Sequence, residues 1–537
     1  MVRRPALPRA ALACAVAVGI APCLLATPAA RAAPGPALTY CTDAAPQGFD
    51  PAQHQTIADS NASGMLLYDT LLRMKPGTTE LAPGLAQRWE FSADGRTLTL
   101  HLRPGVKFHS TAWFAPTREM DADDVLWSLR RMLDPRHPGH AAAAGGFPYW
   151  AGLDLGALVK TVSAPDAMTV RIELARPDAS FLADLTLAGI GAVLSAEYAT
   201  RLQQAGRLAQ LDAQPVGTGP FMLRSYRKDA VVRYDAHPGY WGGAPAVARI
   251  AFAVSPDTGA RAQRVRAGEC LVAPVPADQL PALEADPHLG VLRARPLNTW
   301  YVSPNSTRPF LADKRLRRAL SLAVDRATLV KAAFGGLAEP AGSFLPPGMW
   351  SRDPGLANPY DPAQARALVQ ASGYDGRPLR LFAVAGDANA RRAVELLQAD
   401  WARIGVKVVP ETMELGEFVR RANHGEHDLA YASWFADNGD PDDFLAPNLS
   451  CAAVGHSNKG QWCDPAFDRL LAEGRATADL AARTAAYRRA QALLHDEAAL
   501  IPLAHKVDPY AVSKRVRGFL VTPFDEADFR QASVAPQ

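Results

Sequence analysis

The stretch NARRAVELLQADWARIGVKVVP, residues 389–410, is decisive for the fold class of the chain. Apolar residues recur at helical spacing in its first part, Gly405 ends the helix, and the short apolar segment that follows is typical of a strand. The stretch DPAQARALVQASG, residues 361–373, predicts another helix, because it has an aspartate N-cap, a proline in the first turn and a terminating glycine. Long helices that alternate with short strands over residues 313–409 predict a crossover α/β lobe.

The region over residues 64–216 has a different pattern. The stretch WEFSADGRTLTLHL, residues 89–102, alternates apolar and polar residues on both sides of an Asp-Gly pair, which favours a tight hairpin turn. A helix is predicted over residues 122–133, where acidic residues precede apolar residues at helical spacing. These signals favour antiparallel strands with inserted helices, so the chain as a whole is predicted to be α/β.

Residues 1–32 have the layout of a secretory signal peptide. Four arginines and no acidic residue accompany a short apolar run, and the segment ends in a small-x-small cleavage site, Ala30-Arg31-Ala32. A membrane span needs about 20 apolar residues, and this run is shorter and contains proline. A lipidated start at Cys23 is disfavoured by Pro22. We therefore predict export to the periplasm in soluble form.

The net charge of the chain changes when this segment is removed. The full sequence has 57 basic and 54 acidic residues. Without the four arginines of the signal segment, the mature net charge is about −1, which leaves no global basic field for nucleic acid or anionic lipid. The mature length of roughly 505 residues exceeds a single hydrophobic core and predicts about two to four domains.

Four cysteines follow the signal segment: Cys41, Cys270, Cys451 and Cys463. The short loop between Cys451 and Cys463 favours that pair and leaves Cys41 to pair with Cys270. An oxidising compartment would allow both disulfides to form. A zinc site is the alternative, although the sequence has no C-x-x-C pair.

The stretch SWFADNGDPDDF, residues 433–444, is rich in carboxylates. A calcium loop that starts at Asp437 is excluded, because glycine stands third instead of sixth and the twelfth residue is not glutamate. A catalytic carboxylate pair has no recognisable partner. For Asp440, Asp442 and Asp443 the Asn-Gly and Asp-Pro pairs favour a solvated acidic turn.

Other candidate motifs are weak. The stretch HGEHD, residues 424–428, lacks the H-E-x-x-H spacing that places metal ligands on one helix face, so a solvated turn is favoured and no metal site is predicted. The stretch VGTGPF, residues 216–221, matches no nucleotide-binding loop and is expected to be a turn into a strand. The sequence has no G-x-S-x-G motif and no recognisable catalytic set, so an enzyme is not predicted.

Further stretches carry a family resemblance through nearly the whole mature chain. The main stretches are ALTYCTDAAPQGFDP (37–51), LAPGLAQRWEFSADGRTLTLHLRPGVKFH (81–109), MDADDVLWSLRRM (120–132), ADKRLRRALSLAVDRATLV (312–330) and DNGDPDDF (437–444). Together they resemble the periplasmic dipeptide- and oligopeptide-binding proteins of peptide ABC transporters. The stretches TAWFAPTREMDADDV (111–125) and RPDASFLADL (176–185) look especially like SapA-type receptors associated with antimicrobial-peptide uptake.

The resemblance implies a two-lobed periplasmic-binding-protein clamshell of the class II type with an additional α+β domain. The first lobe would consist of residues 33–68, 218–296 and 508–537. The extra domain would span residues 69–217, and the second lobe residues 297–507. The family also pairs its cysteines in the way inferred above.

The resemblance also singles out ligand-binding residues. In the dipeptide-binding proteins, the aspartate at the place of Asp437 binds the free α-ammonium of the peptide, and a charge-assisted hydrogen bond in a closed cleft suits that role. Trp434 would form part of an apolar wall, with an ordinary core aromatic as the alternative. Thr56, Ile57 and Ala58 are expected to be further ligand contacts.

The sequence departs from these relatives at the partner of the peptide carboxylate. The loop LFAVAGDANARR, residues 381–392, is shorter than theirs and has no arginine before Arg391. Arg391 and Arg392 begin a helix and are expected to be solvated. Loss of the carboxylate clamp would remove a contact worth about 1.5–3 kcal/mol, which puts longer peptides beside dipeptides as ligands.

These observations predict a monomeric, cofactor-free peptide-binding component of an ABC transporter. It would close on its ligand and deliver it to an inner-membrane permease. One alternative is a SapA-like receptor for cationic antimicrobial peptides or haem. An exported peptidase is the alternative from another class.

Overall fold

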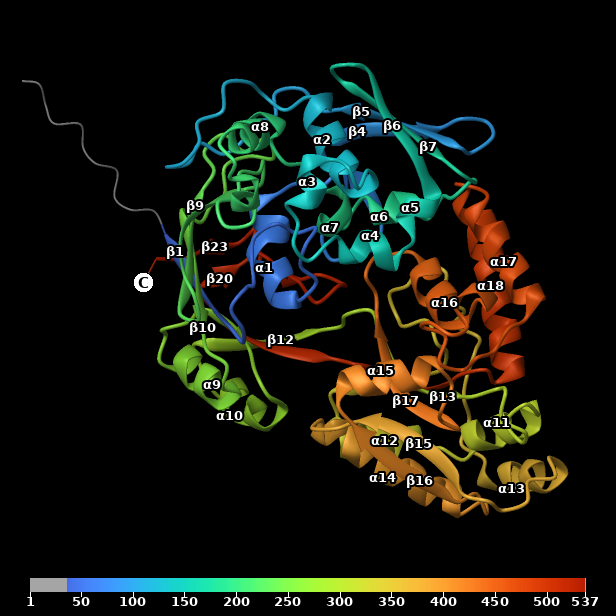
Figure 1. The fold of residues 1–537 in the computed structure, drawn as a ribbon. Helices are drawn as coiled ribbons and strands as arrows, with labels where there is room; N and C mark the ends of the chain where they lie inside the picture. The colour runs from blue at the N-terminus through green and yellow to red at the C-terminus, as the bar shows by residue number, and fades with distance from the viewer. Residues whose placement is uncertain (1–35, 537) are drawn as a thin grey trace, which may run out of the picture. The chain divides into compact units, whose positions relative to one another are not determined.

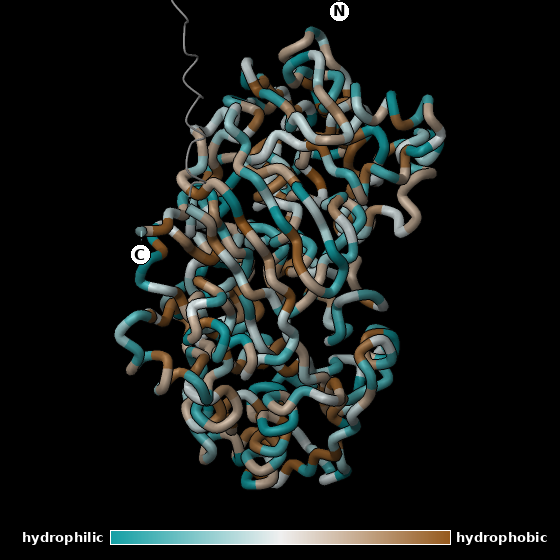
Figure 2. Tube along the Cα trace, turned by 90° about the vertical axis from the view of Figure 1, so that its left-hand side faces the viewer, coloured by the Kyte–Doolittle hydropathy of each residue, from teal (hydrophilic) through white to brown (hydrophobic). Residues whose placement is uncertain are grey.

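Three large sheets organise the chain in the computed structural model, which describes residues 36–536 (Figure 1). The predicted signal peptide therefore lies outside the described residues. None of the described helices is long and apolar enough to cross a membrane. Figure 2 agrees with this finding, because short hydrophobic and hydrophilic segments alternate along the described trace.

The first sheet has seven strands that come from three distant parts of the chain. Its order is β12-β19-β11-β1-β10-β9-β8, with β1 parallel to both β10 and β11 and the other neighbours antiparallel. The strands are β1 (Ala37–Thr42), β8 (Phe221–Arg227), β9 (Val231–Ala236), β10 (Arg249–Val254), β11 (Val272–Pro274), β12 (Leu289–Ala294) and β19 (Asp508–Ser513). The helices of these parts are α1 (Ile57–Leu67), α9 (Thr258–Arg266) and α10 (Leu280–Glu284).

The second sheet has six strands in the order β14-β18-β13-β17-β15-β16. The strands are β13 (Asn298–Pro304), β14 (Ala338–Pro340), β15 (Leu379–Val384), β16 (Val408–Met413), β17 (Leu429–Phe435) and β18 (Ile501–Lys506). The accompanying helices are α11 (Lys314–Leu322), α12 (Arg326–Ala333), α13 (Pro362–Ala371), α14 (Ala388–Ala402), α15 (Leu415–Asn423), α16 (Pro441–Leu449), α17 (Pro465–Arg475) and α18 (Leu480–Glu497).

The predicted crossover unit is confirmed in this sheet. Strands β15 and β16 are parallel, and α14 connects them. The strand after the helix begins at Val408 and not at Val406, because Gly405 (φ +86°) and two further residues complete the turn. Leu381 packs in the cluster that contains α14, whereas Phe382 packs in the cluster that contains α15, so both faces of β15 are covered.

The third sheet is antiparallel and has the order β4-β5-β7-β6. The predicted hairpin over residues 89–102 is confirmed as β4 and β5, and Gly95 takes the positive φ of +68° that its turn requires. The predicted helix over residues 122–133 is confirmed as α2. Its N-cap Asp121 accepts the N–H of Asp123, and Asp124 completes the capping box.

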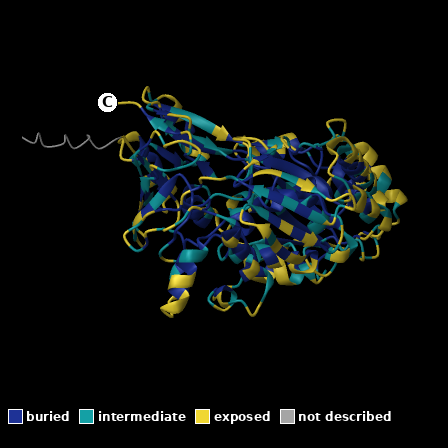
Figure 3. Cartoon of the chain, turned by 90° about the horizontal axis from the view of Figure 1, so that it is seen from above, coloured by how far each residue is buried: buried dark blue, intermediate teal, exposed yellow. Residues whose placement is uncertain are grey.

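This third sheet shares one continuous hydrophobic cluster with the seven-stranded sheet. Its strands are β4 (Ala86–Phe91), β5 (Thr97–Leu102), β6 (Val159–Asp166) and β7 (Thr169–Leu174). The helices here are α2 (Ala122–Leu133), α3 (Pro138–Ala141), α4 (Pro148–Gly152), α5 (Leu155–Leu158), α6 (Phe181–Asp184), α7 (Ala188–Gly191) and α8 (Ala196–Gln204). Short two-stranded sheets pair β2 (Leu72–Met74) with β3 (Leu81–Pro83), β20 (Val516–Arg517) with β23 (Ser533–Val534), and β21 (Leu520–Val521) with β22 (Ala527–Asp528). In Figure 3, buried residues concentrate in the interior and exposed residues on the outer turns of helices.

The chain passes between the seven-stranded and six-stranded sheets at two places. One crossing is residues 295–297, between β12 and β13, and the other is Val507, between β18 and β19. The buried side chain of Asn298 joins them. Its Nδ2 donates to the carbonyls of Pro296 (2.9 Å) and Lys506 (3.0 Å), and its Oδ1 accepts the N–H of Lys506 (2.7 Å). The boundaries proposed above between lobes and extra domain stay a prediction.

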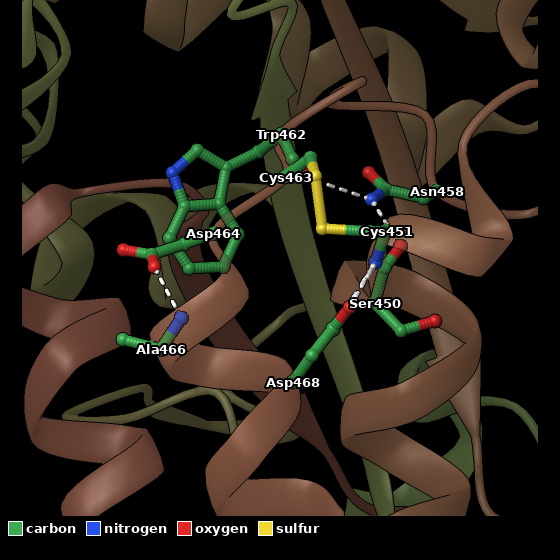
Figure 4. The surroundings of a disulfide bond; sticks show 8 residues. All are labelled: Ser450, Cys451, Asn458, Trp462, Cys463, Asp464, Ala466 and Asp468. Atoms are coloured by element: carbon green, nitrogen blue, oxygen red, sulfur yellow. Dashed lines mark hydrogen bonds between the residues drawn. A yellow bond between two sulfur atoms is a disulfide. The ribbon is translucent and has the colours of Figure 1, made fainter.

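Both predicted disulfides are present, so the zinc alternative is wrong for these cysteines. Cys41 in β1 bonds to Cys270 just before β11, and their Cα atoms are 5.8 Å apart. Cys451 bonds to Cys463 with a Cα distance of 4.5 Å. Figure 4 shows the second bond with Asp468, which accepts the N–H of Cys451 (3.2 Å). The first bond ties two distant strands of one sheet, and the second closes a local loop.

Replacement of the first disulfide by Cys41→Ala/Cys270→Ala is expected to lower the free energy of unfolding by about 4 kcal/mol, because the bond closes a long loop in the unfolded chain. The two cysteines are 229 residues apart, whereas Cys451 and Cys463 are 12 apart. Unfolding in guanidinium chloride without reductant measures the free energy of unfolding of the parent and of the variant. The control Cys451→Ala/Cys463→Ala should cost less, and a parent-like stability of the first variant would contradict the expectation.

Candidate functional site

A cavity of about 430 Å³ lies where distant parts of the chain meet. Its wall includes residues from the beginning of α1, from α4 and α7, from both crossing segments, from the end of β17 and from a hairpin tip near the C-terminus. Small-molecule sites in proteins occupy about 300–1,000 Å³, so this volume is suited to a ligand of that class. A second cavity of about 80 Å³ adjoins it and shares six of its lining residues: Leu187, Ala188, Asp437, Pro523, Phe524 and Glu526.

Asp437 is a carboxylate in this wall without a cation of its own. It lies just after β17, and its backbone N–H donates to Oδ2 of Asp443 at 3.0 Å. Among the described residues, its side chain has neither an ion-pair partner nor a hydrogen-bond partner. Burial raises the pKa of Asp437 to about 6. The site therefore presents a desolvated acid to whatever occupies the cavity.

A second carboxylate, that of Asp443, lies directly behind Asp437. Asp443 is only 4% exposed, and its Oδ1 has no hydrogen-bond partner among the described residues. Burial, and then the charge of Asp437, raise the pKa of Asp443 well above its usual range. Burial and mutual repulsion disfavour the ionisation of both carboxyls at once, so a cation that enters the cavity beside Asp437 would stabilise the charged form there.

The prediction of a solvated acidic turn is wrong for Asp440, Asp442 and Asp443, all of which are buried. Asp440 caps α16, accepting the N–H of Asp442 at 3.0 Å, and pairs with Nη2 of Arg483 at 2.7 Å. Asp442 pairs with Arg475, whose Nη2 lies 2.7 Å from Oδ2. The arginines of α17 and α18 take these two acids out of water and hold the loop that carries Asp437.

The same loop contacts the region of the third sheet. The Nδ2 of Asn438 donates to Oδ1 of Asp184 in α6 at 2.7 Å. Nearby, the N–H of Ala179 donates to the carbonyl of Arg475 at 2.8 Å. Burial and neighbouring acids raise the pKa of Asp184 well above its usual range. These contacts join residues that are more than 250 positions apart in the chain.

Of the other four predicted ligand contacts, only one lines the cavity. Ile57 is 44% exposed and lines the cavity. Thr56 is the N-cap of α1 in a capping box with Asp59, and Ala58 is buried; neither lines the cavity. Trp434 packs partly buried against the cluster around α16–α18, while its neighbour Phe435 lines the cavity.

Sequence reasoning missed part of the wall. Tyr149, Phe435, Lys506 and the hairpin tip over residues 523–526 all line the cavity. The backbone of Leu297 connects two of these parts: its N–H donates to Pro523 at 2.7 Å, and its carbonyl accepts the N–H of Ala436 at 2.8 Å. No local sequence signal marks these residues. They are far apart in the chain, and the crossing segment at Leu297 connects two of the parts to which they belong.

A carboxylate clamp of arginine is absent from the cavity. No arginine is among the described residues that line it. Arg391 and Arg392 are exposed on α14, as predicted. Lys506 lines the cavity, but Asp508 already pairs with it at 2.7 Å. The wall is therefore better suited to bind a cationic group than a free carboxylate.

The solvated turn predicted for residues 424–428 is present over residues 424–426 but is wrong for the last two residues of the stretch. His427 is fully buried and Asp428 nearly so, and burial lowers the pKa of His427 to about 3. Over residues 36–536, no group of three or more His, Cys, Asp or Glu side chains is placed to hold a metal ion.

The sequence of this chain is similar to known bacterial solute-binding proteins over most of its length. The model of the bacterial extracellular solute-binding proteins, family 5, matches residues 80–456. A relative from Pseudomonas aeruginosa (strain UCBPP-PA14), "Di/tripeptide-binding protein 4", is 42% identical over 521 residues, which cover 95% of this chain and 97% of the relative.

Two solved structures share the fold over nearly the whole chain. HbpA2 from Haemophilus parasuis is 34% identical with a TM-score of 0.89, over 93% of this chain and 100% of that one. The dipeptide-binding protein from Pseudoalteromonas sp. SM9913 in complex with Met-Leu is 33% identical with a TM-score of 0.77, over the same shares. The two-lobed fold is thereby shown for this chain.

The variant Arg483→Met is expected to lower the free energy of unfolding by about 3–5 kcal/mol, because it leaves the buried Asp440 without its cation. Arg489→Met is the matched control on the same helix, since the pair of Arg489 with Glu473 is exposed and should contribute at most about 1 kcal/mol. Chemical denaturation measures both variants. Equal losses in the two variants would contradict the structural role of the buried pair.

Proposed function

Because this chain belongs to the bacterial extracellular solute-binding proteins of family 5, we propose that it is the periplasmic peptide-binding component of an ABC transporter. It holds dipeptides or short oligopeptides between its two lobes and delivers them to an inner-membrane permease. The name of the Pseudomonas relative and the Met-Leu ligand of the Pseudoalteromonas structure support short peptides as the ligand class.

The observation that carries the proposal is the uncompensated carboxylate of Asp437 in a cavity of about 430 Å³. A peptide brings a free α-ammonium, which supplies the missing cation and donates charge-assisted hydrogen bonds to the carboxylate. Ile57 and Phe435 add apolar surface to the same wall. Such a wall accepts varied side chains, while the ammonium anchor fixes the orientation of the peptide.

Closure of the lobes completes the mechanism in this proposal. The two crossings between the sheets allow one lobe to move against the other, and closure excludes water and strengthens the polar contacts. The permease recognises the closed, ligand-bound form, so ligand affinity must differ between open and closed forms. The lobes have the boundaries predicted from the sequence, the mature protein is a monomer without catalytic activity, and residues 1–32 direct it to the periplasm.

The proposal is tested by native mass spectrometry of the mature protein purified from the periplasm, followed by release and sequencing of the bound material. Bound peptides of two to about five residues are the expected result for a cavity of this class. A haem mass would replace peptide with iron-porphyrin as the ligand. An empty protein that also fails to bind a mixed peptide pool would overturn the proposal, and peptide turnover would identify a peptidase.

The variant Asp437→Asn is expected to weaken the binding of free-amine peptides at least about tenfold, because a hydrogen bond to a charged group is worth about 1.5–3 kcal/mol. The side chain keeps its size and loses only its charge. Isothermal titration calorimetry measures the affinity, with the exposed Asp496→Asn as the control. Unchanged affinity in Asp437→Asn would remove the anchoring role.

Peptide affinity is also expected to depend on pH. Only the ionised Asp437 attracts an ammonium, and burial raises its pKa to about 6. The affinity of the parent protein should therefore fall about tenfold from pH 7 to pH 5, where a proton competes with the ligand. Calorimetry at both values tests this. For peptides without a charged side chain, the dependence should be weaker in Asp437→Asn than in the parent, and a pH-independent parent would contradict the assignment.

A further inference from the structure

A hairpin tip near the C-terminus forms one wall of the cavity. Strands β21 and β22 pair, and the N–H of Thr522 donates to the carbonyl of Glu526 at 2.8 Å to close the turn. Asp525 takes a left-handed φ of +62°, which aspartate tolerates better than most residues. Four consecutive residues, 523–526, line the cavity, so this turn brings two adjacent carboxylates to the ligand space.

These two carboxylates are anchored by neutral hydroxyl groups. Ser60 of α1, itself a lining residue, donates its hydroxyl to Glu526. Tyr510 donates its hydroxyl to Oδ1 of Asp525 at 3.1 Å. Both contacts position the acids but supply no positive charge. Lys506 and Arg530 act on Asp525 and Glu526 only through their charge and make no ion pair with them.

The cations nearby are already paired. Lys506 lines the cavity and pairs with Asp508, and His54 lines it and lies 2.8 Å from Asp212. Arg530, which lines the smaller cavity, pairs with Asp528 at 2.7 Å. With Asp437, Asp508, Asp525 and Glu526 on the wall, the lining acids outnumber the lining basic residues.

The pKa values of the two acids at the hairpin tip are both raised. Burial, and then the charge of Asp508, raise the pKa of Asp525 to about 7. Burial also raises the pKa of Glu526, and the buried Asp443 behind Asp437 keeps one oxygen without a partner. A single ligand ammonium at Asp437 leaves the charge of the hairpin tip without a partner. A second positive charge on the ligand would offset the desolvation of Asp525 and Glu526 and so stabilise their ionised forms.

We propose that Asp525 and Glu526 form a subsite for a cationic side chain. The preferred ligands are then short peptides that carry lysine or arginine in addition to a free amino terminus. This inference rests on the proposed function and names the substrate class of the same cavity. It assigns the two positive groups of the ligand to separate walls, the α-ammonium to Asp437 and the side-chain cation to the hairpin tip.

Isothermal titration calorimetry of the mature protein with matched peptides tests the subsite. The pairs are Ala-Lys with Ala-norleucine, and Ala-Lys-Ala with Ala-norleucine-Ala, which differ by the side-chain ammonium. The lysine peptide of at least one pair should bind at least about tenfold more tightly, as expected for a charge-assisted contact. The double variant Asp525→Asn/Glu526→Gln keeps both shapes and should abolish this ratio while it retains the affinity for the norleucine peptide.

The control variant is Asp43→Asn. Asp43 is exposed, does not line the cavity, and acts on Asp525 only through its charge. It should keep the lysine-to-norleucine ratio of the parent. Equal affinities for lysine and norleucine peptides, or a ratio that survives in the double variant, would overturn the subsite and leave the peptide-binding proposal standing. Failure of all four peptides to bind would overturn both.

Discussion

The site depends on a half-buried carboxylate, that of Asp437, which has no cation of its own among the residues that the structure describes. Asp437 occupies that position because the loop around it is fixed by buried charges. Arg483 and Arg475 neutralise two acids of the loop, and Asp443 holds the backbone N–H of Asp437. Removal of charges from water is expensive unless each charge is paired, so the two buried ion pairs fix the position of the loop that carries Asp437.

Part of the cavity wall belongs to the segments that connect the sheets. Pro296 and Leu297 of one crossing line the cavity, as do Lys506 and Asp508 on either side of the other. Asn298 ties the two crossings together, and Leu297 links the hairpin tip to the end of β17. Binding and the relative position of the lobes can be coupled without a separate transmitting element.

Elements with strong local signals were predictable from the sequence. The helices that begin after Asp121 and Asp361 have capping residues next to an apolar face, and the hairpin at residues 89–102 has its Asp-Gly turn. The acids after Asp437 were not predictable in the same way. Turn propensity favoured exposure, but Arg475 and Arg483 lie more than thirty residues further along the chain and bury them.

The sequence by itself determined the fold class and the family, because the patterns that identify them are spread over the whole chain. It also predicted the cysteine pairing, since the short loop between Cys451 and Cys463 leaves Cys41 to pair with Cys270. It also singled out Asp437. The tertiary structure alone decided which residues share the cavity, that no arginine is among the described residues that line it, and that Asp525 and Glu526 face the same space. The reason is physical: burial and charge balance depend on contacts between residues hundreds of positions apart, and no local pattern encodes them.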